Sequence, residues 1–215
     1  MNAKVTLIDY GMCNMLSVAR AFEYCGAEVD ITEDPAVVLK AEKLVVPGVG
    51  AFRDSIREVE ARGFGDAIRR FTETGRPFLG ICVGMQMLFE TSEEFGDHPG
   101  LGVLAGRVMA IPKLNTDGGV QRIPHIGWNH LVAPETGRSW RGSFLNEFEG
   151  ENPAFYFVHS FAVTPDDPTL RLADTVYGGH RICAAVQRGN VVATQFHPER
   201  SGGLGLALVR HFISM

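Results

Sequence analysis

Several features that mark membrane, nucleic-acid-binding or disulfide-rich proteins are missing from this chain. No apolar run approaches the roughly eighteen residues of a membrane span, and the first residues lack the charged start and long apolar core of a signal peptide. The net charge is −5 without any basic cluster, so neither a nucleic acid nor a membrane surface is an expected partner. The four cysteines form no C-x-x-C pair, which argues against a zinc site and a disulfide framework and favours a reduced, cytoplasmic setting.

The amino-acid composition of the chain predicts one ordinary globular domain spanning residues 1–215. Hydrophobic residues make up 45% and charged residues 21% of the chain, as in folded proteins with a sizeable core. In residues 1–90, apolar strand patterns alternate with helix patterns, which predicts an α/β fold with a parallel sheet and helices on both faces. The expected strands are 5–9, 29–32, 43–46 and 77–81, and the expected helices are 14–24, 35–40, 56–60 and 64–71.

The second half of the chain has a different pattern, with many strands and few helices. Its hydrophobic alternation predicts antiparallel hairpins, one of them turning at Arg188, Gly189 and Asn190. A short helix is expected near residues 140–145 and a closing helix at 204–213. The expected strands are 102–111, 128–132, 155–163, 170–176, 182–187 and 191–195.

Residues 77–90, PFLGICVGMQMLFE, are the stretch most suggestive of chemistry. An apolar run ends at Cys82, which has Gly80 two residues before it and Gly84 two residues after it, and helix-forming residues follow. This order of strand, sharp turn and helix is typical of a nucleophile elbow, here with sulfur in place of the usual serine oxygen. Backbone N–H groups at the start of the helix favour the thiolate. A lone buried cysteine is more often a small hydrophobe, so the interpretation needs support from other residues.

The segment QFHPE at residues 195–199 offers that support. Residues two apart in an extended segment point the same way, so His197 and Glu199 are expected to face one site. A thiol nucleophile needs a base for its proton, and the base needs a carboxylate that fixes its tautomer. The order Cys, His, Glu fits poorly with an α/β-hydrolase. A solvated histidine and acid at a strand end is an equally good interpretation of this motif alone.

The glycine-rich turn PGVG at residues 47–50 is a candidate oxyanion site. The backbone N–H groups of Val49 and Gly50, with that of Val83 after the cysteine, are expected to stabilise a tetrahedral oxyanion. An ordinary turn between a strand and a helix is the alternative. No G-x-x-x-x-G-K-[ST] or G-x-G-x-x-G motif is present, so nucleotide binding is rejected as the core function.

Together, GICVGMQ, PGVG and QFHPERS resemble the class I (triad) glutamine amidotransferases. The blocks VTLIDYG, IPHIGWN and YFVHSF narrow the resemblance to the glutaminase subunits of imidazole glycerol phosphate synthases, and the matching blocks cover essentially the whole chain. The resemblance implies a flavodoxin-like parallel or mixed sheet flanked by helices, with an additional antiparallel strand layer. It also implies a triad of Cys82, His197 and Glu199 that hydrolyses L-glutamine to L-glutamate and ammonia through a thioester, without a metal or cofactor.

The same resemblance implies a glutamine pocket formed by Gln86, Glu94, His159 and Ser160. For Gln86 and Glu94 the alternative is a solvated position on or just beyond a helix. Because His159 and Ser160 are adjacent on an expected strand, they should point to opposite faces, and one of them has the alternative role of a hydrogen-bonded core group.

The resemblance further implies a partner, a (β/α)8 cyclase that forms a heterodimer with this chain and receives ammonia in histidine biosynthesis. Ammonia released to neutral water becomes mostly ammonium, which is not a nucleophile, so a docked partner that excludes water is chemically reasonable. Candidate interface residues are Asn14, Trp128, Asn129 and Arg200. The alternatives are a core position for Trp128, a helix cap for Asn14 and a solvated position for Arg200.

One departure from the family pattern lies in the first turn, where Cys13 stands at a position that commonly holds glycine. Either this turn needs no positive φ there or its geometry differs. Three other functions remain open: another class I amidotransferase branch, a catalytically silent subunit of the same fold, and a cysteine peptidase or esterase. The motifs PHIGWN and FHPERS favour the histidine branch, and the intact triad argues against a silent copy.

Overall fold

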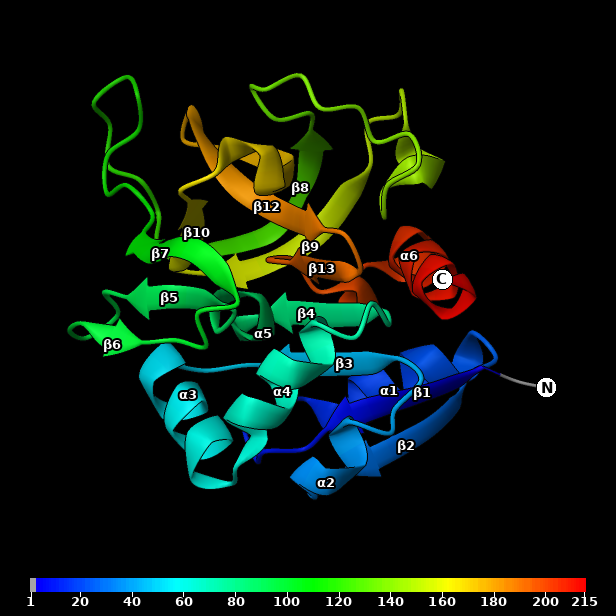
Figure 1. Cartoon of the computed structure of the whole chain (residues 1–215). Coiled ribbons are helices and arrows are strands. Elements are labelled where there is room, and N and C mark those ends of the chain that lie inside the picture. Colours follow the sequence, from blue (N-terminus) through cyan, green and yellow to red (C-terminus); the bar gives the residue numbers. More distant parts are fainter. Residues whose placement is uncertain (1–2) are drawn as a thin grey trace.

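The computed structural model describes residues 3–215, and its first half is a parallel sheet covered by helices on both faces (Figure 1). Helix α1 packs with the closing helix α6, whereas α2 and α3 pack with α4. These elements run in order as β1 (Lys4–Ile8), α1 (Met15–Tyr24), β2 (Glu28–Thr32), α2 (Pro35–Val38), β3 (Leu44–Gly48), α3 (Phe52–Ala61), α4 (Phe64–Thr72), β4 (Phe78–Cys82) and α5 (Val83–Gln86). The four expected strands and the parallel sheet are confirmed.

The second half extends this sheet and adds another one. Its elements are β5 (Phe89–Ser92), β6 (His98–Pro99), β7 (Leu104–Ala110), β8 (His125–Val132), η1 (Asn146–Phe148), β9 (Ala154–His159), β10 (Phe161–Pro165), η2 (Pro168–Leu170), β11 (Arg171–Tyr177), β12 (His180–Arg188), β13 (Val191–Thr194), η3 (Pro198–Arg200) and α6 (Gly202–Ser214). The larger sheet has the order β2-β1-β3-β4-β13-β12-β11-β8-β9, and the smaller one has the order β10-β7-β5-β6.

Parallel pairing ends in the middle of the larger sheet. Strands β2, β1, β3, β4 and β13 are parallel in the flavodoxin-like order, and β12, β11, β8 and β9 continue the sheet as antiparallel neighbours. The β12–β13 hairpin turns at Gly189 and Asn190, because Arg188 pairs with Val191. The expected α/β fold with added antiparallel strands is therefore confirmed.

Three sequence expectations about local structure are wrong. The helix after Cys82 is a single turn, and the chain then enters β5, which the sequence did not predict. The single strand expected at 155–163 is broken at Ser160, so that β9 belongs to the larger sheet and β10 to the smaller one. The expected helix near 140–145 is absent, and Trp140 instead lies in a buried turn where its Nε1 donates to the carbonyl oxygen of Leu172 at 2.8 Å.

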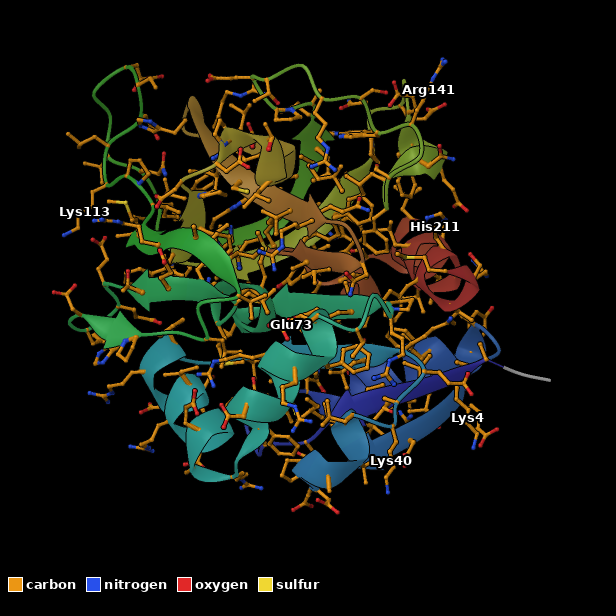
Figure 2. All side chains as sticks on the ribbon, in the orientation of Figure 1. Lys4, Lys40, Glu73, Lys113, Arg141 and His211 are labelled. Carbon is orange, nitrogen blue, oxygen red and sulfur yellow. The ribbon has the colours of Figure 1, made fainter. Side chains whose placement is uncertain are left out.

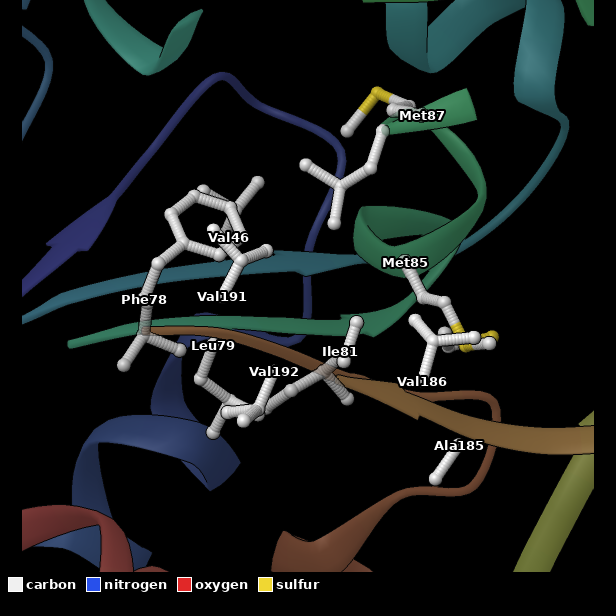
Figure 3. Close-up of a cluster of buried hydrophobic side chains, with 14 of the residues drawn as sticks. Val46, Phe78, Leu79, Ile81, Met85, Met87, Ala185, Val186, Val191 and Val192 are labelled. Atoms are coloured by element: carbon white, nitrogen blue, oxygen red, sulfur yellow. The ribbon is translucent and has the colours of Figure 1, made fainter. Parts of the chain in front are cut away.

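Apolar side chains pack on both faces of the central strands. Figure 3 shows Phe78 and Val191 on one side of β4 and β13, with Leu79 and Val192 on the other. The register pairs Phe78 with Val191 and Leu79 with Val192, as the alternation of side chains along a strand requires. Charged side chains such as Lys113 and Arg141 lie at the periphery (Figure 2). Strands buried on both faces read as continuous apolar runs, which is why they were predictable.

The arrangement of β3, β4 and β13 determines where the candidate site lies. These strands are parallel neighbours, so their carboxyl ends meet at one edge of the sheet. Strand β3 ends at Gly48 in the PGVG turn, β4 ends at Cys82, and β13 ends at Thr194, three residues before His197. Ligands of open α/β sheets bind at this edge, outside the carboxyl ends of the strands.

Candidate active site

Cys82 occupies a strained backbone turn at the end of β4. Its φ of 54° and ψ of −110° lie outside the usual regions for a residue with a side chain. Gly84, two residues later, permits the close crossing of α5 over the sheet, because a Cβ at this position would lie 1.9 Å from the carbonyl oxygen of Val46 in β3. The nucleophile-elbow geometry expected from the sequence is thus present. Because α5 is only one turn long, it supplies N–H groups near the sulfur but little macrodipole.

His197 has one ring nitrogen bonded to a carboxylate and one directed elsewhere without a partner among the described residues. Its Nδ1 lies 2.8 Å from Oε1 of Glu199, and the side chains of the two residues are 4% and 2% exposed. Its buried Nε2 has no hydrogen-bond partner among the described residues. Burial lowers the pKa of His197, but the interactions with Cys82 and Glu199 outweigh it and raise the pKa to about 10. Glu199 therefore favours the protonated form of the His197 imidazole, the form that follows uptake of a proton.

A cavity of about 280 Å³ lies in front of the sulfur, a volume that suits a small molecule rather than a polymer. The expected nucleophile, base, oxyanion and glutamine-pocket residues line it, with the exception of Glu199, which lies behind His197. The lining residues are Val49, Gly50, Cys82, Val83, Gln86, Glu94, Val158, His159, Ser160, Phe161, His197 and Arg200. Residues separated by more than a hundred positions thus meet in one place.

The oxyanion donor expected from the PGVG turn is engaged elsewhere in this conformation. The N–H of Val49 donates to the carbonyl oxygen of Met12 in the first turn at 3.0 Å. Val83 is the first residue of α5, and the N–H groups of a helix's first turn have no partner within the helix. One of the three candidate donors, Val49, is therefore bound to the protein's own backbone.

Gln86 is buried rather than solvated, and its amide nitrogen is used inside the protein. Its Nε2 donates to the carbonyl oxygen of Phe161 and to Oε1 of Gln195, both at 3.0 Å. A carboxamide has two N–H groups, so only Oε1 of Gln86 is left for a ligand. Gln195 in turn places its Nε2 3.5 Å from Sγ of Cys82. Gln195 was not predicted to have a role of its own, although it lies two residues before His197 and the two-residue spacing of an extended segment points to it.

Glu94, His159 and Ser160 reach the cavity in different ways. Glu94 is partly exposed, and its Oε2 accepts from the backbone N–H of Phe52 at 2.6 Å. His159 and Ser160 both line the cavity, and the strand is interrupted at Ser160. This interruption turns the following residue, Phe161, into the smaller sheet.

A second buried histidine, His125, supports His159. Nδ1 of His125 lies 3.0 Å from Nε2 of His159, and Nδ1 of His159 lies 2.9 Å from the carbonyl oxygen of Phe161. A carbonyl accepts only, so Nδ1 of His159 carries the proton and its Nε2 accepts from His125. Burial, aided by the nearby rings of His125 and His197, lowers the pKa of His159 to about 3, and burial lowers that of His125 to about 4. Both rings are therefore neutral at physiological pH.

The candidate interface residues lie at the surface beside this edge. Asn14 occupies the N-cap position of α1, although its exposed side chain makes no cap bond within residues 3–215. Trp128 is 57% exposed, so the alternative of a core position is wrong. Asn129 is partly buried and donates to the carbonyl oxygen of Val176 at 3.0 Å. Arg200 is exposed, with its guanidinium carbon 4.6 Å from the ring centre of Tyr156.

The departure at Cys13 does not distort the first turn. The positive φ of that turn, +86°, falls on Gly11, whereas Cys13 has an ordinary negative φ. The thiol of Cys13 lies 3.7 Å from Oδ1 of Asp9, and burial together with this carboxylate raises its pKa to about 12. Cys13 is therefore a poor competitor of Cys82 for electrophiles.

Over residues 3–215, no group of three or more metal-binding side chains comes together, and no helix has the length and apolar character needed to cross a membrane.

Comparison with known proteins gives consistent matches. The family model Glutamine amidotransferase class-I matches residues 6–214. The imidazole glycerol phosphate synthase subunit HisH 1 of Legionella pneumophila (strain Lens) is 45% identical over 213 residues, covering 99% of this chain and 100% of that protein. The imidazole glycerol phosphate synthase subunit HisH of Syntrophotalea carbinolica is 46% identical over 212 residues, covering 98% of this chain and 100% of that protein. Among solved structures, PurLQS from Thermotoga maritima has a TM-score of 0.74 at 22% identity, covering 100% of this chain and 98% of that one, a likeness that shows the fold alone.

Proposed function

Because the chain belongs to the class I glutamine amidotransferase family, we propose that it is the glutaminase subunit of an imidazole glycerol phosphate synthase. The observation that carries the chemistry is the strained Cys82, which lines one cavity with His197, whose Nε2 has no hydrogen-bond partner within residues 3–215. The relatives' names and their near-complete coverage favour the imidazole glycerol phosphate branch over other amidotransferases. The intact Cys82, His197 and Glu199 argue against a silent subunit.

In the proposed reaction, the proton of Cys82 moves to Nε2 of His197. The sulfur attacks the side-chain carbonyl carbon of L-glutamine, a carbon–sulfur bond forms, and the carbonyl electron pair moves to oxygen. Nε2 then gives its proton to the departing amine, so ammonia leaves and a glutamyl thioester remains. Water attacks the thioester, L-glutamate is released, and the thiol is restored. Glu199 keeps Nδ1 protonated and Nε2 directed at the site throughout. These steps require no metal or cofactor.

We expect the isolated chain to be a poor glutaminase. The N–H of Val49, a proposed oxyanion donor, is bonded to Met12 in this conformation. Loss of one such donor lowers kcat by about 10²- to 10³-fold in other hydrolases. A change in this turn is therefore part of the proposed activation, and binding of the partner and its nucleotide ligand is its proposed cause.

The proposed partner is a (β/α)8 cyclase that forms a heterodimer with this chain and receives the ammonia before water protonates it. Asn14, Trp128, Asn129 and Arg200 are its proposed contacts. They are supported by the exposure of Asn14, Trp128 and Arg200 and by the position of Arg200 in the cavity lining. A cytoplasmic location is also proposed, and it is supported by the four free cysteines.

The testing experiment compares nitrogen sources in the complex of the chain with its cyclase. Cys82→Ala should abolish product formation from L-glutamine, while ammonium salts still support it. Cys183→Ala, which removes another buried cysteine, is the matched control and should leave glutamine use near the wild-type level. Glutamine turnover that survives Cys82→Ala would show that the nucleophile lies elsewhere. Equal activity with and without the cyclase would remove the coupling but leave the glutaminase assignment intact.

A further inference from the structure

The carboxamide of Gln195 is an unusual neighbour for a core cysteine. Its side chain is 0% exposed, and its Nε2 faces Sγ of Cys82 at 3.5 Å. A thiol is a weak hydrogen-bond acceptor, so burying an amide against it gains little stability. A thiolate is a strong acceptor, and hydrogen bonds to charged acceptors are about twice as strong as neutral ones. The hydrogen bond from Gln195 is therefore most stabilising when the sulfur of Cys82 carries negative charge.

The direction of this hydrogen bond follows from the backbone. The carbonyl of Phe161 can only accept, so the atom of Gln86 that faces it at 3.0 Å must be the amide nitrogen. The same nitrogen lies 3.0 Å from the Gln195 carboxamide, which must present its oxygen there. That leaves the nitrogen of Gln195 to face the sulfur. One main-chain carbonyl thus fixes the orientation of two side-chain amides, and neither can flip without losing a buried hydrogen bond.

The backbone of Gln195 is also fixed. Its N–H donates to the carbonyl oxygen of Ala184 at 2.8 Å, which prolongs the pairing of β13 with β12 beyond Thr194. The side chain therefore starts from a rigid strand end next to Cys82, since β13 and β4 are parallel neighbours. A donor held this firmly needs little rearrangement when charge develops on the sulfur.

We propose that Gln195 is a catalytic residue that stabilises the thiolate of Cys82 through its Nε2–H, with Gln86 as the positioning residue that fixes its orientation. The inference rests on the proposed role of Cys82 as the glutamine-attacking nucleophile. Gln195 acts at two points in the cycle. It stabilises the sulfur after its proton has moved to His197, and again when the carbon–sulfur bond of the thioester breaks and the electron pair returns to sulfur.

Alkylation of the full chain by iodoacetamide tests the proposal, because the reagent reacts with the thiolate and needs no glutamine. The rate at Cys82 is followed by peptide mass spectrometry as a function of pH. Gln195→Met, which keeps the bulk but removes the donor, should lower the rate at pH 7 by about tenfold, as expected for one lost hydrogen bond to a charged group. The pH at half-maximal rate should rise by about one unit, while the plateau at high pH stays unchanged. A purely structural disturbance would change the plateau instead.

Two further variants make the result decisive. Gln195→Glu keeps the shape but places an oxygen against the sulfur, so the half-maximal pH should rise at least as far as in Gln195→Met. Gln121→Met changes another buried carboxamide, which is 6% exposed and whose side-chain atoms have no hydrogen-bond partner within residues 3–215. This variant should leave the pH profile at the wild-type position. A folded Gln195 variant with a wild-type profile would overturn the proposal. Failure of the proposed function is recognised separately, by glutamine turnover that persists in the Cys82→Ala complex.

Discussion

Replacement of Gly84 by alanine tests whether the nucleophile depends on the close crossing of α5 over the sheet. The Cβ would lie 1.9 Å from the carbonyl oxygen of Val46, and ordinary contact begins near 3.4 Å, so the two backbones must separate by about 1.5 Å. Strand β3 lies between β1 and β4 and is fixed on both sides, which means that α5 must move. Because Gly84 is two residues after Cys82, this movement displaces the sulfur from the base.

The magnitude follows from two opposing effects. Alanine is favoured over glycine in a helix by about 1 kcal/mol, whereas overpacking a buried site costs about 1–3 kcal/mol and occasionally more. At a separation as short as this one we expect the upper end of the cost, so that Gly84→Ala is destabilised by about 2 kcal/mol. For a chain of this length the melting temperature should fall by about 4–8 °C. A misplacement of about 1 Å also costs about a hundredfold in rate.

Calorimetry and glutamine hydrolysis by the cyclase complex, assayed well below the melting temperature, measure the two effects. Gly203→Ala is the matched control, because its Cβ would have no heavy atom within 4 Å and it lies in the first turn of α6. It should melt at or slightly above the wild-type temperature with full activity. A Gly84→Ala protein that melts and reacts like wild type would refute the idea that glycine is required for the crossing.

Two other predictions concern buried charges. Burial lowers the pKa of His197, but Cys82 and Glu199 outweigh burial and raise this pKa from 6.5 to about 10. The stability that the raised pKa contributes is therefore complete below pH 6.5 and is lost as the pH rises toward 10. Glu199→Gln should therefore reduce the free energy of unfolding in urea more at pH 6 than at pH 10, and an equal loss at both would contradict the assignment. Asp174 is 1% exposed and forms ion pairs with two arginines. Asp174→Asn should therefore lower the free energy of unfolding by about 3 kcal/mol. Lys4→Gln, which removes an exposed ion pair, should lower it by less than about 1 kcal/mol. Equal urea midpoints for these two variants would contradict the role of the buried carboxylate.

The parts of the fold that the sequence predicted well are those in which burial decides the structure. Strands β1, β3 and β4 are apolar runs between polar turns, and each begins or ends within two residues of its expected bounds. Two errors have a different origin. Nothing in the run from Phe155 to Val163 marks a break, because the residue at which the strands separate is a serine rather than glycine or proline. The helix after Cys82 stops at Gln86 because the following residues pair with β7, a tertiary contact that outweighs helix propensity.

The candidate site was predictable where its residues follow parallel strands or stand two apart. Cys82, His197 and the PGVG turn lie at or just beyond the carboxyl ends of β4, β13 and β3, and strand polarity brings such positions to one edge. His125 was not predicted to have a role, because its partner His159 lies on the antiparallel neighbour β9 and only the register brings them together. The internal use of the Gln86 amide could not be read from the sequence either, since it depends on the carbonyl direction at Phe161.

The two halves of the site differ in how ready they are for reaction. The attacking half is assembled, because Glu199 already bonds His197 and the imidazole and the sulfur line one cavity. The oxyanion half is not yet assembled, because the N–H of Val49 is bonded to the carbonyl oxygen of Met12. Met12 is two residues from exposed Asn14, so the backbone that holds Val49 is continuous with the surface proposed to contact the cyclase. A partner that shifts this one turn would release the donor without disturbing the proposed triad. The donor is needed only once a tetrahedral oxyanion forms, so such a contact would control the chemical step more than the binding of glutamine.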